Sequence, residues 1–337
     1  MAESIVLPTV QPYFSVYNWH ANLQSIILNH PDWSPWIYSN YIQIYMDVRP
    51  EITFADFYLN NGLTHTTSCP FVERNSISRQ IVKRFSNFVD FIVECIRAEN
   101  YIYLVADISK ISRYSETLTK YHEIFLYGYD HGQGIFFISD FIQGKYSSFT
   151  ASFKEIEEAI NSTYEKTFDH LQHIELWKYK PDSSYAFDII NVRNQILEYV
   201  NCTNSSEKYR QQEPPHPFRT FGLNVFNIIL DHLQYVQSQG KNRIDVRPFY
   251  LLYIRYKLMC ERLRYMEENK FIGNIADCFE SYLKLSNLAQ INSNLALKYQ
   301  LTKKESIITT MQSTIQIIYK EDKELSERLL VVMDRSI

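Results

Sequence analysis

The sequence predicts an α+β fold, in which helices pack on an antiparallel sheet in the first half of the chain and an all-helical region follows. Two observations lead to this fold class. Short runs of β-branched and aromatic residues, separated by turn residues, occur before about residue 180. Beyond that point, apolar residues recur only at the three- and four-residue spacing of helices. We therefore expect two domains, at residues 1–180 and 181–337.

The regular pattern of the first half starts with a helix, predicted over residues 79–98 from apolar residues that share one helical face. Three strands are expected next, over residues 101–108, 123–129 and 135–141. Ser152 and Glu155 have the spacing of a capping box, which predicts a helix that begins there and runs to about residue 171. A further strand is expected over residues 174–179, before Pro181.

The second half contains only helical periodicity. The predicted helices lie over residues 184–200, 222–239, 248–269, 273–300 and 303–333. Gly240 and Pro248 mark a helix end and a helix start, and Thr302 with Glu305 has the spacing of a second capping box. The polar, proline-rich segment 201–219 is typical of an exposed loop.

The composition excludes several classes of function. The chain has 34 Lys and Arg against 38 Asp and Glu, a net charge of −4 and no basic stretch, so nucleic acid is not an expected partner. Neither a G-x-x-x-x-G-K-[ST] nor a G-x-G-x-x-G motif occurs among its 8 glycines, which excludes a phosphate cradle of either kind. Its 5 scattered cysteines lack C-x-x-C spacing, which suggests neither a disulfide framework nor a zinc site and predicts reduced thiols. No metal and no cofactor are expected.

The sequence also bears on localisation. Its first residues lack the basic and apolar stretches of a secretory signal. No run reaches the roughly 18 apolar residues that a membrane helix requires. We expect a cytoplasmic protein with no membrane partner.

The most informative pattern is a predicted hairpin that follows the first helix. If Asp130, His131 and Gly132 form a three-residue loop, with Gly132 in the left-handed conformation, His122 lies directly opposite Asp140. A loop one residue longer or shorter would put these two side chains on opposite faces. A carboxylate beside an imidazole fixes its tautomer and raises its basicity, as a general base in acyl transfer requires. The alternative interpretation is that His122 ends a strand and Asp140 caps a turn.

A wider pattern surrounds this pair. The pattern begins with a His at the start of an apolar strand, followed by a G-Y-D turn and a second apolar strand that ends at an Asp. After this hairpin come G-K-Y, an F-x-x-S-F run and an acidic helix. This pattern resembles the His/Asp half of papain-like domains. It is most similar to acyltransferases of the butirosin biosynthesis protein H type and, more distantly, to the peptidase domains of bacteriocin exporters. The resemblance covers roughly residues 8–170 and is most specific over residues 121–158.

The resemblance implies a papain-like fold for the first domain and a catalytic Cys near the N-terminus, at the start of a buried helix. In those families the His activates the Cys, and an oxyanion-stabilising side chain precedes it. Here Gln11 is the candidate oxyanion donor, but the stretch where the Cys would fall reads Tyr17, Asn18, Trp19, His20 and contains no thiol. The covalent mechanism of the family therefore lacks its nucleophile at that position.

Three explanations of the missing Cys remain open. Cys69 could be a nucleophile at a helix start. The alternative interpretation of Cys69 is a small buried hydrophobic residue. His122, aided by Asp140 and His20, could deprotonate an amine that attacks a thioester directly. For His20 alone, the competing interpretation is an ordinary core residue. Alternatively, catalysis is lost and the site only binds.

The function that the resemblance implies is acyl transfer or condensation in a specialised-metabolite pathway, such as nonribosomal peptide or antibiotic biosynthesis. An acyl or aminoacyl group would pass from the thioester of an acyl or peptidyl carrier protein to an amine or peptide substrate, with His122 as general base and Asp140 as its orienting partner. The alternative is a non-catalytic papain-like module that binds a peptide or a carrier protein. The His/Asp pair favours an enzyme, and the missing Cys favours the binding module.

Overall fold

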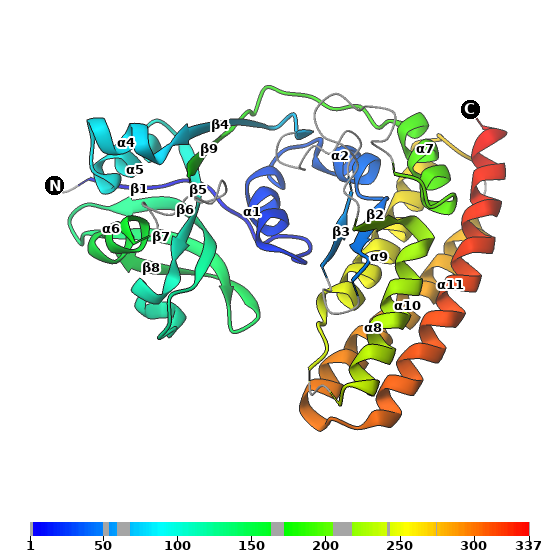
Figure 1. The fold of residues 1–337 in the computed structure, drawn as a ribbon. Coiled ribbons are helices and arrows are strands. Elements are labelled where there is room, and N and C mark those ends of the chain that lie inside the picture. The colour runs from blue at the N-terminus through cyan, green and yellow to red at the C-terminus, as the bar shows by residue number, and fades with distance from the viewer. Residues whose placement is uncertain are drawn as a thin grey trace. The chain divides into compact units, whose positions relative to one another are not determined.

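The computed structural model describes residues 3–49, 54–58, 68–162, 172–204, 218–240, 243–273 and 275–336. The chain forms two compact units (Figure 1). One comprises Met1–Trp33 and His65–Ser184, and the other comprises Ser34–Thr64 and Tyr185–Ile337. This division differs from the sequence-based one in the segment 34–64, which the sequence assigned to the first domain.

The first unit contains an antiparallel sheet. Among the described residues, its strands follow the order β4-β9-β5-β6-β7-β8, and β1 also pairs with β6. The strands are β1 (Ser4–Val6), β4 (Val72–Ser78), β5 (Asn100–Asp107), β6 (Tyr121–Asp130), β7 (Ile135–Ile142), β8 (Lys145–Ser152) and β9 (His173–Tyr179). The four predicted strands are confirmed as β5, β6, β7 and β9. The sequence analysis missed β4 and β8 because their residues, VERNSIS and KYSSFTAS, are mostly polar.

Helices cover both faces of this sheet. They are α1 (Asn18–Ile27), α4 (Arg79–Phe85), α5 (Phe88–Arg97) and α6 (Phe153–Asn161). The predicted helix over residues 79–98 is interrupted, because the Asn87 side chain accepts a hydrogen bond from the backbone N–H of Asp90 and begins a new helix there. The Ser152–Glu155 capping box is confirmed. Most of the predicted continuation of that helix to residue 171 lies outside the described residues.

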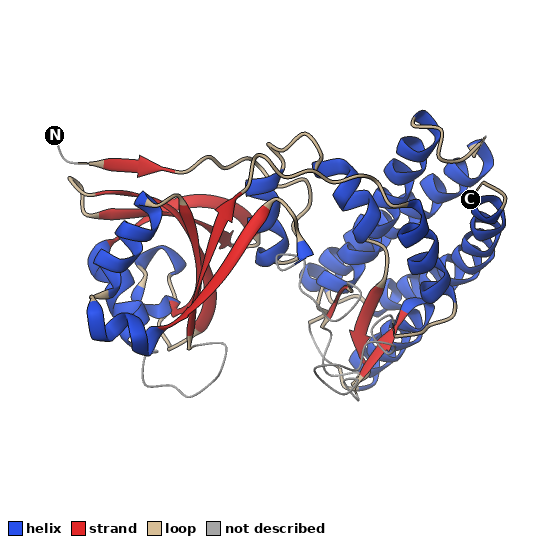
Figure 2. Ribbon diagram, turned by 90° about the horizontal axis from the view of Figure 1, so that it is seen from above, coloured by secondary structure: helices blue, strands red, loops and turns tan. Residues whose placement is uncertain are grey.

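Alternation along β7 separates the two faces. Phe136 and Asp140 share one face, and the ring of Phe136 packs 4.6 Å from that of Phe153 at the start of α6. Phe141 points to the other face with its partner Tyr146, whose hydroxyl donates to Asn22 on α1 at 2.6 Å. Helices α1 and α6 therefore lie on opposite faces of the sheet (Figures 1 and 2).

The second unit is mainly helical. Its helices are α2 (Trp33–Asn40), α7 (Ile189–Val200), the short 3-10 helix η5 (Gly222–Asn224), α8 (Val225–Ser238), α9 (Arg247–Glu268), α10 (Ala276–Thr302) and α11 (Glu305–Asp334). The expectation of an all-helical second domain needs one correction, since β10 (Arg219–Phe221), β2 (Ile44–Asp47) and β3 (Ala55–Phe57) pair in a small antiparallel sheet. This pairing explains why the segment 34–64 belongs to the second unit.

The second predicted capping box is also wrong. Thr302 is the last residue of α10, and its hydroxyl donates to the carbonyl of Lys298 at 2.9 Å. Lys303 takes a left-handed conformation with φ of 56°, and Lys304 precedes α11 without a capping side chain. The chain therefore reverses through these lysines and not through a Thr–Glu pair.

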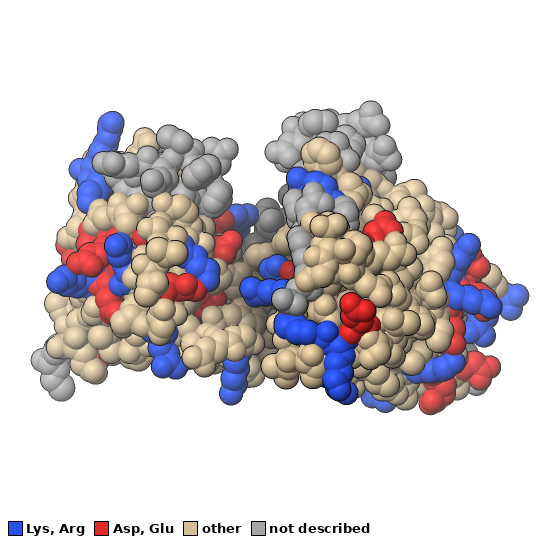
Figure 3. All heavy atoms as spheres, turned by 60° about the horizontal axis from the view of Figure 1, so that its bottom comes forward, with Lys and Arg blue, Asp and Glu red and all other residues tan. Residues whose placement is uncertain are grey.

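The surface carries charges of both signs on the face shown in Figure 3. None of the helices in the described part of the chain combines the length and the apolar character that crossing a bilayer requires.

Candidate functional site

The hairpin between β6 and β7 differs from the predicted one. Asp130 pairs with Ile135, so the turn spans residues 131–134, and the left-handed glycine is Gly134 with φ of 65°, not Gly132. The Asp130 carboxylate accepts a hydrogen bond from the backbone N–H of Gln133 at 2.9 Å, which stabilises this longer turn. The direct pairing of His122 with Asp140 is therefore incorrect.

A β-bulge nevertheless brings the two side chains together. The register shifts between Leu126 and Gly128, so that Phe125 pairs with Ser139. Extending this register puts Asp140 level with Ile124, which places His122 diagonally across from Asp140 on the same face. Without the extra residue, the register nearest the turn would place the two side chains on opposite faces.

The bulge lies where β1 reaches the sheet. A Cβ atom at Gly128 would lie 2.7 Å from the carbonyl oxygen of Ile5 and 3.0 Å from the Cα of Val6. Only glycine therefore allows β1 to pair this closely with β6, where Val6 is opposite Gly128.

His122 and Asp140 are in direct contact. Nε2 of His122 lies 2.8 Å from Oδ2 of Asp140. The Asp140 side chain is only 1% exposed, whereas that of His122 is 30% exposed. Asp140 also accepts hydrogen bonds from the backbone N–H of Phe141 at 2.6 Å and from the hydroxyl of Tyr114 at 2.5 Å. Three donors thus hold a buried carboxylate in a fixed orientation against the ring of His122.

The protonation of His122 follows from these neighbours. Burial disfavours the charged ring, but the hydrogen bond and the charge of Asp140, with a smaller contribution from Glu123, outweigh it and raise the pKa of His122. When the ring is neutral, the acceptor Asp140 places the remaining proton on Nε2, which leaves the lone pair on Nδ1. Nδ1 lies 3.7 Å from Oε2 of Glu123, beyond hydrogen-bonding distance. His122 therefore has a basic nitrogen that Asp140 does not occupy.

Tyr114 is a member of the site that no sequence pattern indicates. It ends the 3-10 helix η3 (Ser112–Tyr114), and its ring meets that of Phe149 edge-on at 5.5 Å and that of His122 at 6.1 Å. Burial and the adjacent Asp140 carboxylate raise the pKa of Tyr114, so its hydroxyl stays a donor to Asp140. No sequence signal identifies it, because it lies in an irregular segment far along the chain from Asp140.

Two carboxylates hold the segment that carries Tyr114. Asp107 caps η2 (Ile108–Lys110) and accepts hydrogen bonds from the backbone N–H groups of Ser109 and Lys120, both at 3.1 Å. Glu155 on α6 accepts from the backbone N–H of Ser112 at 2.9 Å. Although burial opposes it, these hydrogen bonds together with those of Ser152 lower the pKa of Glu155 to about 2. These hydrogen bonds hold the segment near its two ends, at Ser109 and Lys120, and also at Ser112, close to Tyr114.

A pocket of about 280 Å³ opens beside His122. Its lining residues come from the 108–120 segment and from the end of the hairpin: Ile108, Arg113, Tyr114, Ser115, Glu116, Lys120, His122, Phe141, Ile142 and Gln143. The pocket combines an imidazole with two basic side chains and one acidic side chain. A small molecule bound there could reach the accessible ring of His122.

The other predicted site residues do not line this pocket. His20 is fully buried in α1, among the rings of Phe14, Tyr17 and Trp19 at 6.0–6.4 Å. Because α1 covers the face of the sheet opposite Asp140, the structure does not bring His20 to the pair. Gln11 is exposed in the segment that precedes α1.

Gln24, and not Gln11, is the amide that organises the start of α1. Its side-chain oxygen accepts from the backbone N–H groups of Tyr13 and Phe14 at 3.0 and 3.1 Å, and its nitrogen donates to the carbonyl of Phe14 at 3.0 Å. These contacts fix the turn into the helix. They do not involve the His122 pocket.

Cys69 is a buried core residue. It is 3% exposed, and burial raises the pKa of its thiol to about 12. A thiol in this environment stays protonated at neutral pH and is a poor nucleophile. Cys69 also does not line the pocket. The structure therefore favours its interpretation as a small buried hydrophobic residue over that as a nucleophile.

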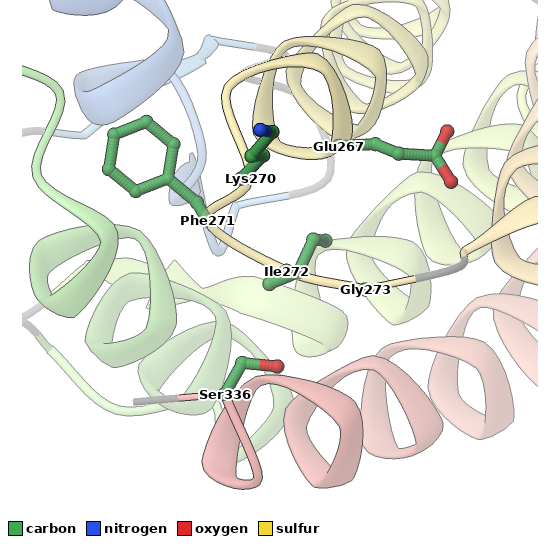
Figure 4. A pocket seen from close by; sticks show the side chains of 6 residues that line it. All are labelled: Glu267, Lys270, Phe271, Ile272, Gly273 and Ser336. Atoms are coloured by element: carbon green, nitrogen blue, oxygen red, sulfur yellow. The ribbon is translucent and has the colours of Figure 1, made fainter.

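A second, more open hollow of about 670 Å³ lies in the helical unit (Figure 4). It is lined by Glu267, Lys270, Phe271, Ile272, Gly273 and Ser336. The carboxylate of Glu267 and the ring of Phe271 point in opposite directions, so these side chains do not converge on one ligand (Figure 4). The described residues contain no group of three or more His, Cys, Asp or Glu side chains that could hold a metal ion. The His122 pocket is therefore the candidate functional site.

Comparison with known proteins does not assign the chain to a family. No protein-family model matches it, and no curated protein matches it significantly. The papain-like relationship therefore stays a prediction.

Proposed function

We propose that the chain catalyses acyl transfer from a thioester to an amine, with His122 as general base and Asp140 as its orienting partner. The observation that carries the proposal is the 2.8 Å contact between Nε2 of His122 and the buried carboxylate of Asp140, beside a pocket that His122 lines. A carrier protein as the donor and a specialised-metabolite pathway remain parts of the proposal that rest on the resemblance alone.

The proposed reaction needs no nucleophile from the protein. The amine nitrogen attacks the thioester carbonyl carbon, and the π electrons move to the carbonyl oxygen. Nδ1 of His122 takes the proton that the nitrogen must lose, and Asp140 stabilises the resulting imidazolium. The carbonyl then re-forms while the C–S bond breaks, and the thiolate leaves with that electron pair. Transfer of the proton from Nδ1 to the thiolate gives an amide and a thiol and restores the neutral ring.

Tyr114 acts in this proposal as a positioning residue. Its hydroxyl binds the same oxygen of Asp140 that faces His122. It therefore limits rotation of the carboxylate without touching the reacting atoms.

The test measures thiol release from short acyl thioesters of N-acetylcysteamine with a panel of primary amines. His122→Ala and Asp140→Asn should each lower the rate at least 100-fold, the usual contribution of a positioned general base. His131→Ala is the matched control, because His131 is exposed in the hairpin turn and does not line the pocket. Equal rates in wild type and His122→Ala would end the enzymatic proposal.

A non-catalytic module that binds a carrier protein or peptide is the second candidate. It is favoured by the position of α1, whose first residues occupy the stretch where the related families place their nucleophile, on the face opposite Asp140. Calorimetry with carrier protein in loaded and unloaded forms tests it. Binding without any thioester turnover would favour this module, and absence of binding would exclude it.

A further inference from the structure

We propose that Arg113 binds an anionic group of the substrate, a carboxylate or a phosphate, at the pocket that His122 lines. The inference deepens the proposed function and rests on it, because it names a chemical feature of the molecule that the same pocket would hold.

The positive charge of Arg113 is not compensated by the other charged side chains around the pocket. Lys120 and Glu116 form an ion pair at 2.5 Å and largely compensate each other. Asp140 is directed at His122 and Tyr114. The side chain of Arg113 makes no hydrogen bond and no ion pair with any residue in the part of the chain that the structure describes. An exposed guanidinium that lines a pocket without a counter-charge favours an anionic ligand.

The backbone of Arg113 is well held, although its side chain is exposed. Its neighbours in η3 are Ser112, whose N–H is bound by Glu155, and Tyr114, whose hydroxyl is bound by Asp140. Arg113 therefore starts from a fixed point next to the His122–Asp140 pair. A planar guanidinium can bind a carboxylate or phosphate through two parallel hydrogen bonds, which orients the ligand as well as attracting it.

The pocket volume limits the ligand. About 280 Å³ is near the lower end of the range of small-molecule sites. It suits a small acid or the phosphate end of a longer chain. In the proposed reaction the anion has two sources: a phosphate on a pantetheine-type donor arm, or a carboxylate on an amino acid acceptor.

The experiment compares pairs of probes of which one carries the anionic group and the other lacks it. The ring signals of His122 are followed by NMR at low ionic strength, since salt would screen an exposed arginine. One arm titrates 4′-phosphopantetheine against pantetheine, and the other titrates glycine against glycinamide. In at least one arm we expect the probe that carries the anionic group to bind the wild-type chain at least tenfold more tightly than the analogue that lacks it, and the arm that responds identifies the source of the anion.

Arg113→Gln should abolish that tenfold preference, and Arg113→Lys should keep part of it because the charge remains but the paired hydrogen bonds are lost. Lys110→Gln is the matched control, since Lys110 is an exposed cation on the same segment that does not line the pocket. Equal binding of the probes with and without the anionic group in both arms, or an unchanged preference in Arg113→Gln, would overturn the inference.

The readout separates this inference from the proposed function. If the preference depends on Arg113 but no thioester turns over, anion binding stands and acyl transfer fails. If turnover depends on His122 while the preference does not depend on Arg113, acyl transfer stands and the anion site fails.

Discussion

Two buried aspartates in this chain have similar partners and different surroundings. Asp140 in the sheet unit and Asp322 in the helical unit are both almost inaccessible, at 0% exposure. Each accepts a hydrogen bond from a tyrosine hydroxyl at 2.5 Å, Tyr114 in one case and Tyr199 in the other. The difference lies in the cation that each one faces.

Asp322 is fully buried and hydrogen-bonded to side chains of three helices. It accepts hydrogen bonds from Tyr199 on α7, from Tyr256 on α9 at 2.8 Å and from Ser326 on α11 at 3.0 Å. Its ion-pair partner, Arg255, is also fully buried, at 3.3 Å, and stacks its guanidinium 3.5 Å from the centre of the Tyr199 ring. This network joins three helices of the unit, and both of its charged side chains are inaccessible to solvent.

His122, in contrast, keeps part of its ring open to a pocket, and an imidazole can gain or lose a proton. A guanidinium such as that of Arg255 remains charged and offers no such exchange. A buried carboxylate that accepts a hydrogen bond from a tyrosine is therefore not in itself evidence of a functional site. What distinguishes the candidate site is that the partner of its carboxylate is partly exposed and can lose its proton.

The largest expected effect is on the closed network. Asp322→Ala should destabilise the helical unit by about 3–5 kcal/mol, because it leaves Arg255 charged, buried and without its carboxylate. Urea unfolding followed by far-ultraviolet circular dichroism measures the change. Asp334→Ala is the control, since Asp334 pairs with Arg193 on the surface and should contribute little. A similar small effect in both variants would contradict the role given to the network.

The comparison also shows what the sequence could predict. Alternation and turn residues located β5, β6, β7 and β9, and the hairpin pattern singled out His122 and Asp140. These signals are local, because each strand is encoded within its own segment and His122 and Asp140 lie within one hairpin. The contact was predicted, although the register that was used to predict it was wrong.

The remaining features depend on contacts between residues far apart in the sequence. The bulge next to Gly128 reflects the approach of β1 from the N-terminus. Tyr114 reaches Asp140 from an irregular segment, and the pairing of β2 with β10 moves the segment 34–64 into the second unit. No periodicity within one segment encodes such pairings, so sequence reasoning could not find them.

The open site should respond more weakly in stability than the closed one. Tyr114→Phe removes one of the three donors to Asp140 while His122 and the N–H of Phe141 remain, so we expect a loss of about 1 kcal/mol. The carboxylate would then interact more strongly with the imidazolium, and the pKa of His122 should rise further. NMR titration of the His122 ring measures this change. Phe149→Leu, which alters the packing against Tyr114 and removes no donor to Asp140, should leave that pKa nearly unchanged.

A Tyr114→Phe variant whose His122 titrates as in the wild type would show that Tyr114 does not act through Asp140. If the Phe149→Leu control shifted the pKa as strongly, the effect of Tyr114 would be one of packing. Both outcomes would remove the positioning role.

The smallest effect is the pH dependence of stability that His122 confers. Its pKa is raised in the folded chain, since Asp140 and Glu123 favour the charged ring by more than burial and Lys120 oppose it. The folded chain therefore binds this proton more tightly than the unfolded chain. The resulting stabilisation is fully present below the unfolded pKa of about 6.5 and is lost as the pH rises through the folded pKa.

The variant His122→Asn removes the titrating ring and should remove this dependence. The difference in unfolding free energy between wild type and variant should be largest below about pH 6 and should shrink as the pH rises through the folded pKa. Urea unfolding at a series of pH values measures it. A difference that grew with pH would mean that burial outweighs Asp140 and lowers the pKa of His122. The ring would then be neutral at lower pH than we infer, and Asp140 would not stabilise its charged form.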